Sequence, residues 1–182
     1  MEEGVRGCLN GRRGHGPRRG SLGIPSGTAG LTLLVLVAAC ATGTGPAAPM
    51  AIVDTWIVSG PDSIPLTVEV AATTAQAEQG LMDRTTLAPD AGLLFLFDEP
   101  RAADDAFWMW RTLIPLDLAA LDREGRILVI LPMDPCREPD PDACTPYVPG
   151  VVHAGALEMN QGWFSRHGVE VGDRVRLPGG GG

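Results

Sequence analysis

The sequence predicts a mainly β fold with one or two short helices, arranged as an antiparallel sandwich or a distorted barrel. Three observations support this prediction. About seven short apolar segments recur between turn residues, which is typical of all-β architectures. Several of them alternate apolar and polar residues with the period of two that marks a half-buried strand. Helix signals occur only near residues 73–82 and 161–167, and both segments are short.

Three strands are expected in the first half of the domain. Residues 52–59 alternate loosely and suit an edge strand. Residues 66–70 alternate strictly, so their three apolar side chains share one inward face. Residues 92–97 form a continuous apolar run bounded by turn residues, which predicts a buried strand.

Thr73 predicts the start of the first helix, over residues 75–82. Its hydroxyl can cap the helix while the side chain of Gln76, three residues on, reaches back to the cap, as in a capping box. Gly80 is tolerated near the end of this segment at a cost of about 1 kcal/mol.

The stretch from Phe107 to Leu121 holds two of the four tryptophans and a Thr-Leu-Ile-Pro turn. We expect it to begin one β-hairpin that extends to Val129, with a second strand that stops at Pro132. Residues 133–149 are rich in proline, so regular structure is not expected there.

The end of the domain combines a strand, a short helix and a closing strand. Residues 151–159 alternate, which places His153 on one face and Glu158 on the other. Residues 161–167 suit a helix that is ended by a glycine. Residues 169–177 contain a turn and predict the final strand.

Residues 1–39 have the features of a signal peptide. Several arginines precede an apolar run over residues 31–37, which is too short for a permanent membrane span. Small residues precede Cys40, and a cysteine at this point resembles the lipobox of bacterial lipoproteins. The resemblance implies cleavage before Cys40 and acylation of the new terminus, which anchors a protein to a membrane. An ordinary secretory signal with a chance cysteine is the alternative.

This leader sets the predicted domain organisation and location. After the signal peptide, residues 40–51 are expected to form a flexible tether. Residues 52–178 are long enough for one β-rich domain, and residues 179–182 form a glycine tail. We predict an extracytoplasmic protein whose partner is the membrane, through lipid on Cys40.

The charge of the chain argues against nucleic-acid binding. It carries 22 acidic and 14 basic residues, for a formal net charge of −8 at pH 7. An acidic domain repels a phosphate backbone, and the predicted domain has no cluster of arginines to offset this repulsion. We therefore expect no nucleic-acid partner.

Cys136 and Cys144 are the cysteines that remain in the predicted domain. In an oxidising compartment such a pair is expected to form a disulfide. The spacing is not Cys-x-x-Cys and no histidine pair lies nearby, which argues against a zinc site or a redox role. The acids around this loop also lack the register of a calcium loop. We expect no metal and no cofactor.

Asp117 and Glu158 each lie in an otherwise apolar strand, where an unpaired carboxylate is costly. One interpretation is structural: each acid pairs with Arg84, Arg111 or a backbone N–H. The other is functional: the acids line a cleft together with aromatic side chains, which suits a neutral or sugar-like ligand. The candidate ligand-binding residues are Trp110, Arg111, Asp117, Tyr147 and Glu158.

Three functions follow from these residues. The first is a binding module of the cell envelope for a small polar ligand or a glycan. The second is a hydrolase that uses Asp117 and Glu158 as an acid–base pair, which requires both carboxyl groups within about 10 Å in one pocket. The third is an assembly partner that exposes an apolar patch. No catalytic residue is assigned, because no known nucleophile or phosphate-binding motif occurs.

Several sequence blocks, in order between residues 66 and 177, resemble the domain of unknown function 192 family. They are Gly80-Leu-Met-Asp-Arg84, Gly92-Leu-Leu-Phe-Leu-Phe97, Phe107-Trp-Met, Thr112-Leu-Ile-Pro-Leu-Asp117, Met133-Asp-Pro-Cys136, Leu157-Glu158 and Gly162-Trp-Phe164. The resemblance implies a small β-rich fold with a jelly-roll-like sandwich, and the family has no settled activity. Relatives often carry Lys-Asn or Arg-Asn where this chain has Trp110-Arg111. Any role of that basic residue is then either lost here or passed to Arg111.

Overall fold

The computed structural model of the protein describes residues 48–179. The predicted signal peptide, Cys40 and most of the predicted tether lie outside the described residues, as do the last three glycines. Within residues 48–179, no helix combines the length and the apolar character that crossing a membrane requires.

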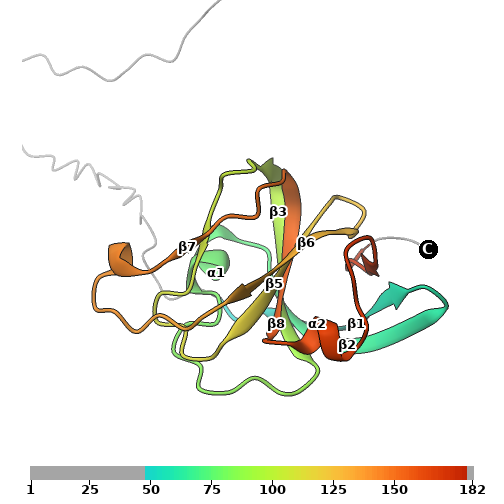
Figure 1. Ribbon diagram of the computed structural model, residues 1–182, viewed down its shortest axis with the longest axis horizontal. Coiled ribbons are helices and arrows are strands. Elements are labelled where there is room, and N and C mark those ends of the chain that lie inside the picture. Colours follow the sequence, from blue (N-terminus) through green and yellow to red (C-terminus); the bar gives the residue numbers. More distant parts are fainter. Residues whose placement is uncertain (1–47, 180–182) are drawn as a thin grey trace, which may run out of the picture. The chain divides into compact units, whose positions relative to one another are not determined.

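In the described part, seven strands form one sheet in the order β6-β5-β8-β3-β2-β1-β9 (Figure 1). Their bounds are β1 (Ala51–Ser59), β2 (Asp62–Ala71), β3 (Ala91–Arg101), β5 (Leu116–Leu121), β6 (Ile127–Met133), β8 (His153–Asn160) and β9 (Arg174–Val175). Two further strands, β4 (Phe107–Trp108) and β7 (Pro146–Tyr147), pair in a small second sheet. The helical elements are α1 (Thr74–Gln79), the 3-10 turn η1 (Pro141–Ala143) and α2 (Trp163–Arg166).

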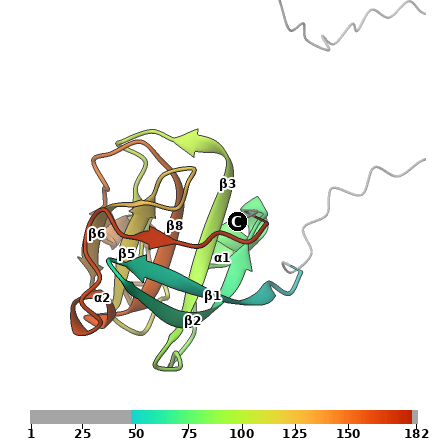
Figure 2. The same ribbon diagram turned by 90° about the vertical axis from the view of Figure 1, so that its right-hand side faces the viewer.

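The large sheet curls into a half-barrel, and the β1–β2 hairpin crosses in front of β3 in Figure 2. Strand β9 pairs with β1 on one side, while its Arg174 bridges Arg126, just before β6, on the other. The two ends of the sheet therefore meet at this point. The paired strands are antiparallel except β2 and β3, which are parallel because α1 forms the crossover between them. The predicted fold class, a mainly β distorted barrel with short helices, is confirmed.

Helix α1 begins where its sequence signal predicts, but it ends at Gln79 and does not continue to residue 82. The Thr73 hydroxyl accepts a hydrogen bond from the backbone N–H of Gln76, and the Gln76 side chain accepts one from the backbone N–H of Thr73. This reciprocal pair satisfies two N–H groups that a helix end leaves open. Gly80 follows as the C-terminal cap, and its φ of 47° suits a residue without a side chain.

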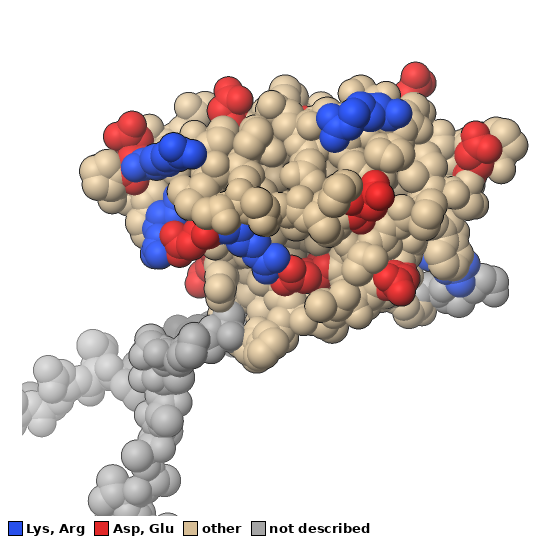
Figure 3. Space-filling view, turned by 90° about the horizontal axis from the view of Figure 1, so that it is seen from below, with Lys and Arg blue, Asp and Glu red and all other residues tan. Residues whose placement is uncertain are grey.

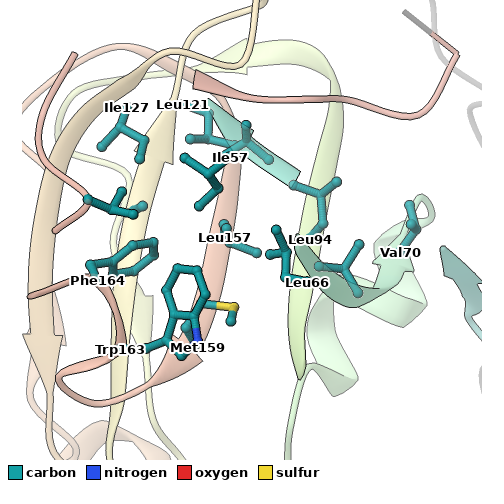
Figure 4. Close-up of a cluster of buried hydrophobic side chains, with 14 residues drawn as sticks. Ile57, Leu66, Val70, Leu94, Leu121, Ile127, Leu157, Met159, Trp163 and Phe164 are labelled. Atoms are coloured by element: carbon teal, nitrogen blue, oxygen red, sulfur yellow. The ribbon is translucent and has the colours of Figure 1, made fainter. Parts of the chain in front are cut away.

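The main core fills the inside of the curl (Figure 4). It contains apolar side chains from both halves of the sheet and two aromatic side chains from α2, of which Trp163 is fully buried. The Trp163 indole N–H donates to Asp90 at 3.0 Å, so its polar edge is satisfied. The buried members of this cluster are Ile57, Leu66, Val68, Val70, Leu94, Ala119, Leu121, Ile127, Leu157, Met159, Trp163, Phe164, Val169 and Val175.

A second apolar cluster lies on the other face of β3, β5 and β8. Successive side chains of a strand point to opposite faces, so Leu94 enters the main core while Leu93 and Phe95 enter the second cluster. Residues of α1, β4 and β7 pack against it, which leaves the three central strands covered on both sides. The buried members are Ala71, Leu81, Leu93, Phe95, Met109, Leu116, Leu118, Met133 and Ala156.

Gly92 allows β3 and β8 to approach closely. A Cβ at this position would lie 2.6 Å from the backbone oxygen of Glu158, closer than real Cβ atoms come. Because a backbone oxygen in a sheet has little room to move, only glycine fits here without displacing β8.

The predicted hairpin from Phe107 to Val129 is shorter in the structure. Residues 107–108 form β4 and pair with β7, while the hairpin itself joins β5 to β6. The physical reason lies between them: Arg111 adopts a φ of 56°, and the segment then turns through Pro115 before β5 begins. The proline-rich segment 133–149 is mostly irregular, as predicted, apart from η1 and the two residues of β7.

Candidate functional site

A pocket of about 400 Å³ opens beside the second apolar cluster. Its walls come from α1 and the turn after it, the second half of β3, the loop that leads into β4, and β8. We call it the Glu158 pocket. Its size is near the lower end of ligand-binding cavities in proteins, which suits a small molecule rather than a polymer.

Glu158 lies in the middle of β8, between Leu93 of β3 and Leu118 of β5. Its exposed fraction is 6%, and within residues 48–179 its side chain has no hydrogen bond and no ion pair. Burial raises the pKa of the Glu158 carboxyl to about 8, because the charged form loses water and gains no partner. The buried carboxyl group is therefore mostly protonated at pH 7.

An aromatic wall stands beside Glu158 in the pocket. The rings of Phe95, Phe97, Phe107 and His153 form it, and neighbouring centroids in this wall lie 5.6 to 6.5 Å apart. Phe95 and Phe97 come from β3, Phe107 from β4 and His153 from the first position of β8. Side chains of three strands thus build one surface.

His153 is almost fully buried, with an exposed fraction of 1%. Its Nδ1 lies 3.0 Å from the Val151 carbonyl oxygen, which can only accept, so Nδ1 carries the proton. In the neutral ring Nε2 is then an acceptor, and it has no hydrogen-bond partner among the described residues. The prediction that His153 and Glu158 lie on opposite faces is wrong, since both line this pocket; the register between β3 and the start of β8 is irregular next to His153.

The pocket mouth combines an exposed aromatic ring with charges. Trp108 is 62% exposed and lines the mouth. The Arg101 guanidinium lies 4.8 Å from the centre of the Phe97 ring and 3.9 Å from the Asp105 carboxylate. A cation therefore already stacks on one ring of the aromatic wall.

Asp117 points to the opposite face of the sheet from Glu158. It pairs in register with Met159 of β8, whereas Glu158 pairs with Leu118. Its carboxylate accepts a 2.7 Å hydrogen bond from the Gly162 backbone N–H. Burial raises the pKa of Asp117, while this hydrogen bond and the Arg166 charge act against the rise. The backbone-partner interpretation therefore describes Asp117.

The hydrolase interpretation requires both carboxyl groups in one pocket. The register places Asp117 with the main core and Glu158 in the pocket on the other side, so a single substrate cannot lie between them. The structural interpretation named Arg84 and Arg111 as partners of the two acids, but both arginines pair with other acidic residues. Arg84 forms a double hydrogen bond with Glu69, and Arg111 pairs with Asp83.

Trp110 and Arg111 hold loops together outside the pocket lining. The Trp110 indole N–H donates to the Glu138 carbonyl oxygen at 3.2 Å, and Trp110 forms a bridge with Cys136. The Arg111 guanidinium stacks 5.5 Å from the Trp110 ring, and its ion pair with Asp83 ties this loop to the turn after α1.

Tyr147 fastens the same region. It pairs with Phe107 across the small β4–β7 sheet, and its hydroxyl accepts a 2.9 Å hydrogen bond from the Asp134 backbone N–H. Of the five candidate ligand-binding residues, the structure thus places Glu158 in the pocket. Ligand contacts of the other four remain predictions, and the site described here does not use them.

The disulfide between Cys136 and Cys144 is present, as predicted. The disulfide closes the loop that contains η1. It lies next to the isolated backbone β-bridge between Trp110 and Cys136. Its role here is to pin the proline-rich segment against the second apolar cluster, in which Cys136 packs.

Sequence reasoning missed most of the pocket. The aromatic wall, Arg101 and α1 have no common motif, because the pocket joins them only through the fold. The one signal that did point to the site is a carboxylate in an apolar strand, and it identified Glu158.

The fold and the pocket define a class of protein: a small β half-barrel domain with a pocket built around a buried acid. The model of the DUF192 family, described as "Uncharacterized ACR", matches residues 57–177. The chain belongs to this family, which confirms the resemblance. No curated protein matches the chain.

Two solved structures are similar over nearly their whole lengths. One is a Sinorhizobium meliloti protein described as a proposed transcription regulator, which is 34% identical with a TM-score of 0.62 over 71% of this chain and 96% of that one. The other is a protein of unknown function from Novosphingobium aromaticivorans, 30% identical with a TM-score of 0.61 over 72% of this chain and 94% of that one.

Proposed function

We propose that the protein is a lipid-anchored extracytoplasmic binding module that holds a small polar ligand in the Glu158 pocket. The observation that carries this proposal is Glu158 itself. A polar group that is buried without a partner costs free energy, so buried carboxyl groups are normally paired. Glu158 has no partner of its own, and its carboxyl group lines a cavity that is large enough for a small molecule.

A perturbed carboxyl pKa in a cavity supports the same proposal. Groups of this kind concentrate at functional sites, because binding and catalysis need polar atoms that the protein itself leaves unsatisfied. A ligand that donates hydrogen bonds to Glu158 recovers part of the cost of burying it. The aromatic wall adds flat apolar surface against which such a ligand can pack.

The proposed location depends on the leader and the disulfide. Cys40, with its preceding small residues, supports acylation, and the Cys136–Cys144 bridge is compatible with an oxidising compartment. Because β1 begins at Ala51, only a short stretch of chain separates it from Cys40. Lipid on Cys40 would therefore keep the domain close to the membrane surface. Envelope glycans and small solutes of that compartment are then the ligands to test.

The charge of this chain does not suit a role in binding nucleic acid. Figure 3 shows one face of the domain, on which arginines and acidic side chains are interspersed and do not form a basic patch. The net charge of −8 also opposes binding to a phosphate backbone. A hydrolase is not proposed, because Asp117 and Glu158 lie on opposite faces.

A thermal-shift screen of the full chain tests the proposal. The panel contains small amines, alcohols, carboxylates and monosaccharides. A ligand at ten times its Kd stabilises the protein by about 1.4 kcal/mol, which raises the Tm by roughly 3 to 5 °C for a domain of this size.

Two variants show whether a hit occupies the pocket. Ala106→Trp places a large ring at the mouth, where Ala106 is exposed, and should abolish the shift. Glu170→Gln changes an exposed glutamate outside the pocket and should leave the shift unchanged. The proposal fails if no compound in the panel raises the Tm, or if Ala106→Trp leaves every shift intact.

A further inference from the structure

We propose that the ligand of the Glu158 pocket carries a small organic cation, a primary ammonium group that pairs with the Glu158 carboxylate beside the aromatic wall. This inference rests on the proposed binding function and names its ligand class. It follows from three properties of the pocket: the kind of polar atom left open, the nature of the wall and the balance of charge.

Two residues of the pocket leave an acceptor open: Glu158 when its carboxyl group is ionised, and His153 at Nε2. The ionised Glu158 carboxylate can only accept hydrogen bonds, and no donor in residues 48–179 reaches it. The neighbouring His153 cannot replace a donor from the ligand, because its Nδ1 proton is used by the Val151 carbonyl. The ligand must therefore bring the donors, and an ammonium group brings three.

The wall favours a cation over a neutral donor. Aromatic faces are electron-rich and attract cations within about 6 Å of the ring centre. The pocket already contains one example, since the Arg101 guanidinium lies 4.8 Å from the Phe97 centroid. Phe95, Phe107 and Glu158 line the same pocket, so a ligand ammonium bound there has both aromatic rings and a carboxyl group within the lining.

The charge of the pocket lining also favours a cation. The ionisable groups that face the pocket are Glu78 from α1, Arg101 from β3, Asp105 from the loop before β4, and His153 and Glu158 from β8. The lining thus contains three acidic residues and one arginine. This excess of acidic groups would repel an anionic ligand. The arginine of the lining, Arg101, is already close to the Asp105 carboxylate.

Cation binding must be linked to the loss of a proton from Glu158. The free pocket holds this carboxyl mostly protonated at pH 7, because burial raises its pKa to about 8. The ion pair requires the ionised form, whereas a primary amine, like lysine, stays charged up to a pH of about 10. Affinity should therefore rise about tenfold per pH unit between pH 6 and 7.5 and level off above pH 8.

The test uses three probes of nearly equal size: n-butylammonium, butan-1-ol and butyrate. Each is titrated into the full chain by isothermal titration calorimetry at pH 7.5, with n-butylammonium repeated at pH 6.5. We expect n-butylammonium to bind at least tenfold more tightly than butan-1-ol, and butyrate to bind most weakly. Glu158→Gln should weaken n-butylammonium at least tenfold and butan-1-ol much less, and Glu170→Gln should change neither.

The outcomes separate this inference from the function on which it rests. If butan-1-ol or butyrate binds as tightly as n-butylammonium, or if Glu158→Gln binds the amine normally, the ammonium assignment is wrong while the pocket remains a binding site. If no compound of the wider screen binds, both proposals fall. If circular dichroism shows that Glu158→Gln does not fold, Ala106→Trp replaces it, and retained amine binding in that variant overturns the inference.

Discussion

Replacement of Glu158 by glutamine should change how the stability of the protein depends on pH. The substitution keeps the shape of the side chain and removes its charge. In the folded protein the Glu158 pKa is raised from 4.5 to about 8 by burial, whereas in the unfolded chain it returns to its ordinary value. Its stabilising contribution is thus complete below pH 4.5 and is lost as the pH rises through 8.

The size of this effect follows from the pKa difference. The shift of 8 − 4.5 = 3.5 units corresponds to about 5 kcal/mol over the whole range. Most of it falls in a range that is easy to measure: between pH 5 and 7 the wild-type free energy of unfolding should drop by roughly 2 to 3 kcal/mol from this group alone. The glutamine variant is neutral throughout and should lack this part of the slope.

Urea denaturation of both proteins at pH 5, 6, 7 and 8 measures the difference directly. Other titrating groups contribute equally to the two curves, so they cancel in the comparison. Glu170→Gln, which changes an exposed glutamate, should follow the wild type. If wild type and Glu158→Gln keep a constant difference from pH 5 to 8, the carboxyl is not held in its neutral form and the reasoning about the pocket is refuted.

Three further changes test the scaffold by denaturation. Gly92→Ala should destabilise the protein by about 1 to 3 kcal/mol, because the new Cβ meets the Glu158 backbone oxygen. The control Gly60→Ala, with open space around it, should cost only about 1 kcal/mol. Equal losses in the two variants would contradict the argument. Replacement of Cys136 and Cys144 by alanine should cost about 2.5 kcal/mol, and reduction of the wild type should cost the same. Thr73→Ala should cost about 1 kcal/mol through loss of the α1 cap, and Thr73→Ser should retain most of it.

The elements that could be predicted are those whose signals are local. Alternation identified β2 and β8, and the Thr73–Gln76 pair identified the start of α1, because each depends on residues a few positions apart. The parallel pairing of β2 with β3, the β4–β7 sheet and the curl of the large sheet depend on contacts between distant segments. A single sequence carries no signal for such contacts.

The candidate site was predicted in part for the same reason. Glu158 was recognised because a carboxylate interrupts an apolar strand, and that cost is independent of the rest of the fold. The interpretation that Asp117 and Glu158 line one cleft depended on the register between β5 and β8. A shift of one residue between paired strands sends a side chain to the other face of the sheet. Trp110 and Arg111 lie outside the pocket lining and contact neighbouring loops, and their predicted ligand contacts stay predictions.

Asp117 and Glu158 show how one sheet treats two similar groups differently. Asp117 faces the inside of the curl, where the chain places Gly162, with a φ of 77°, so that its N–H meets the carboxylate. Glu158 faces outward, and the elements that cover it, α1 and the loop before β4, come near without supplying a donor. Glu158 thus remains a buried carboxyl group beside a cavity, and we propose that a ligand supplies the partner that the chain does not.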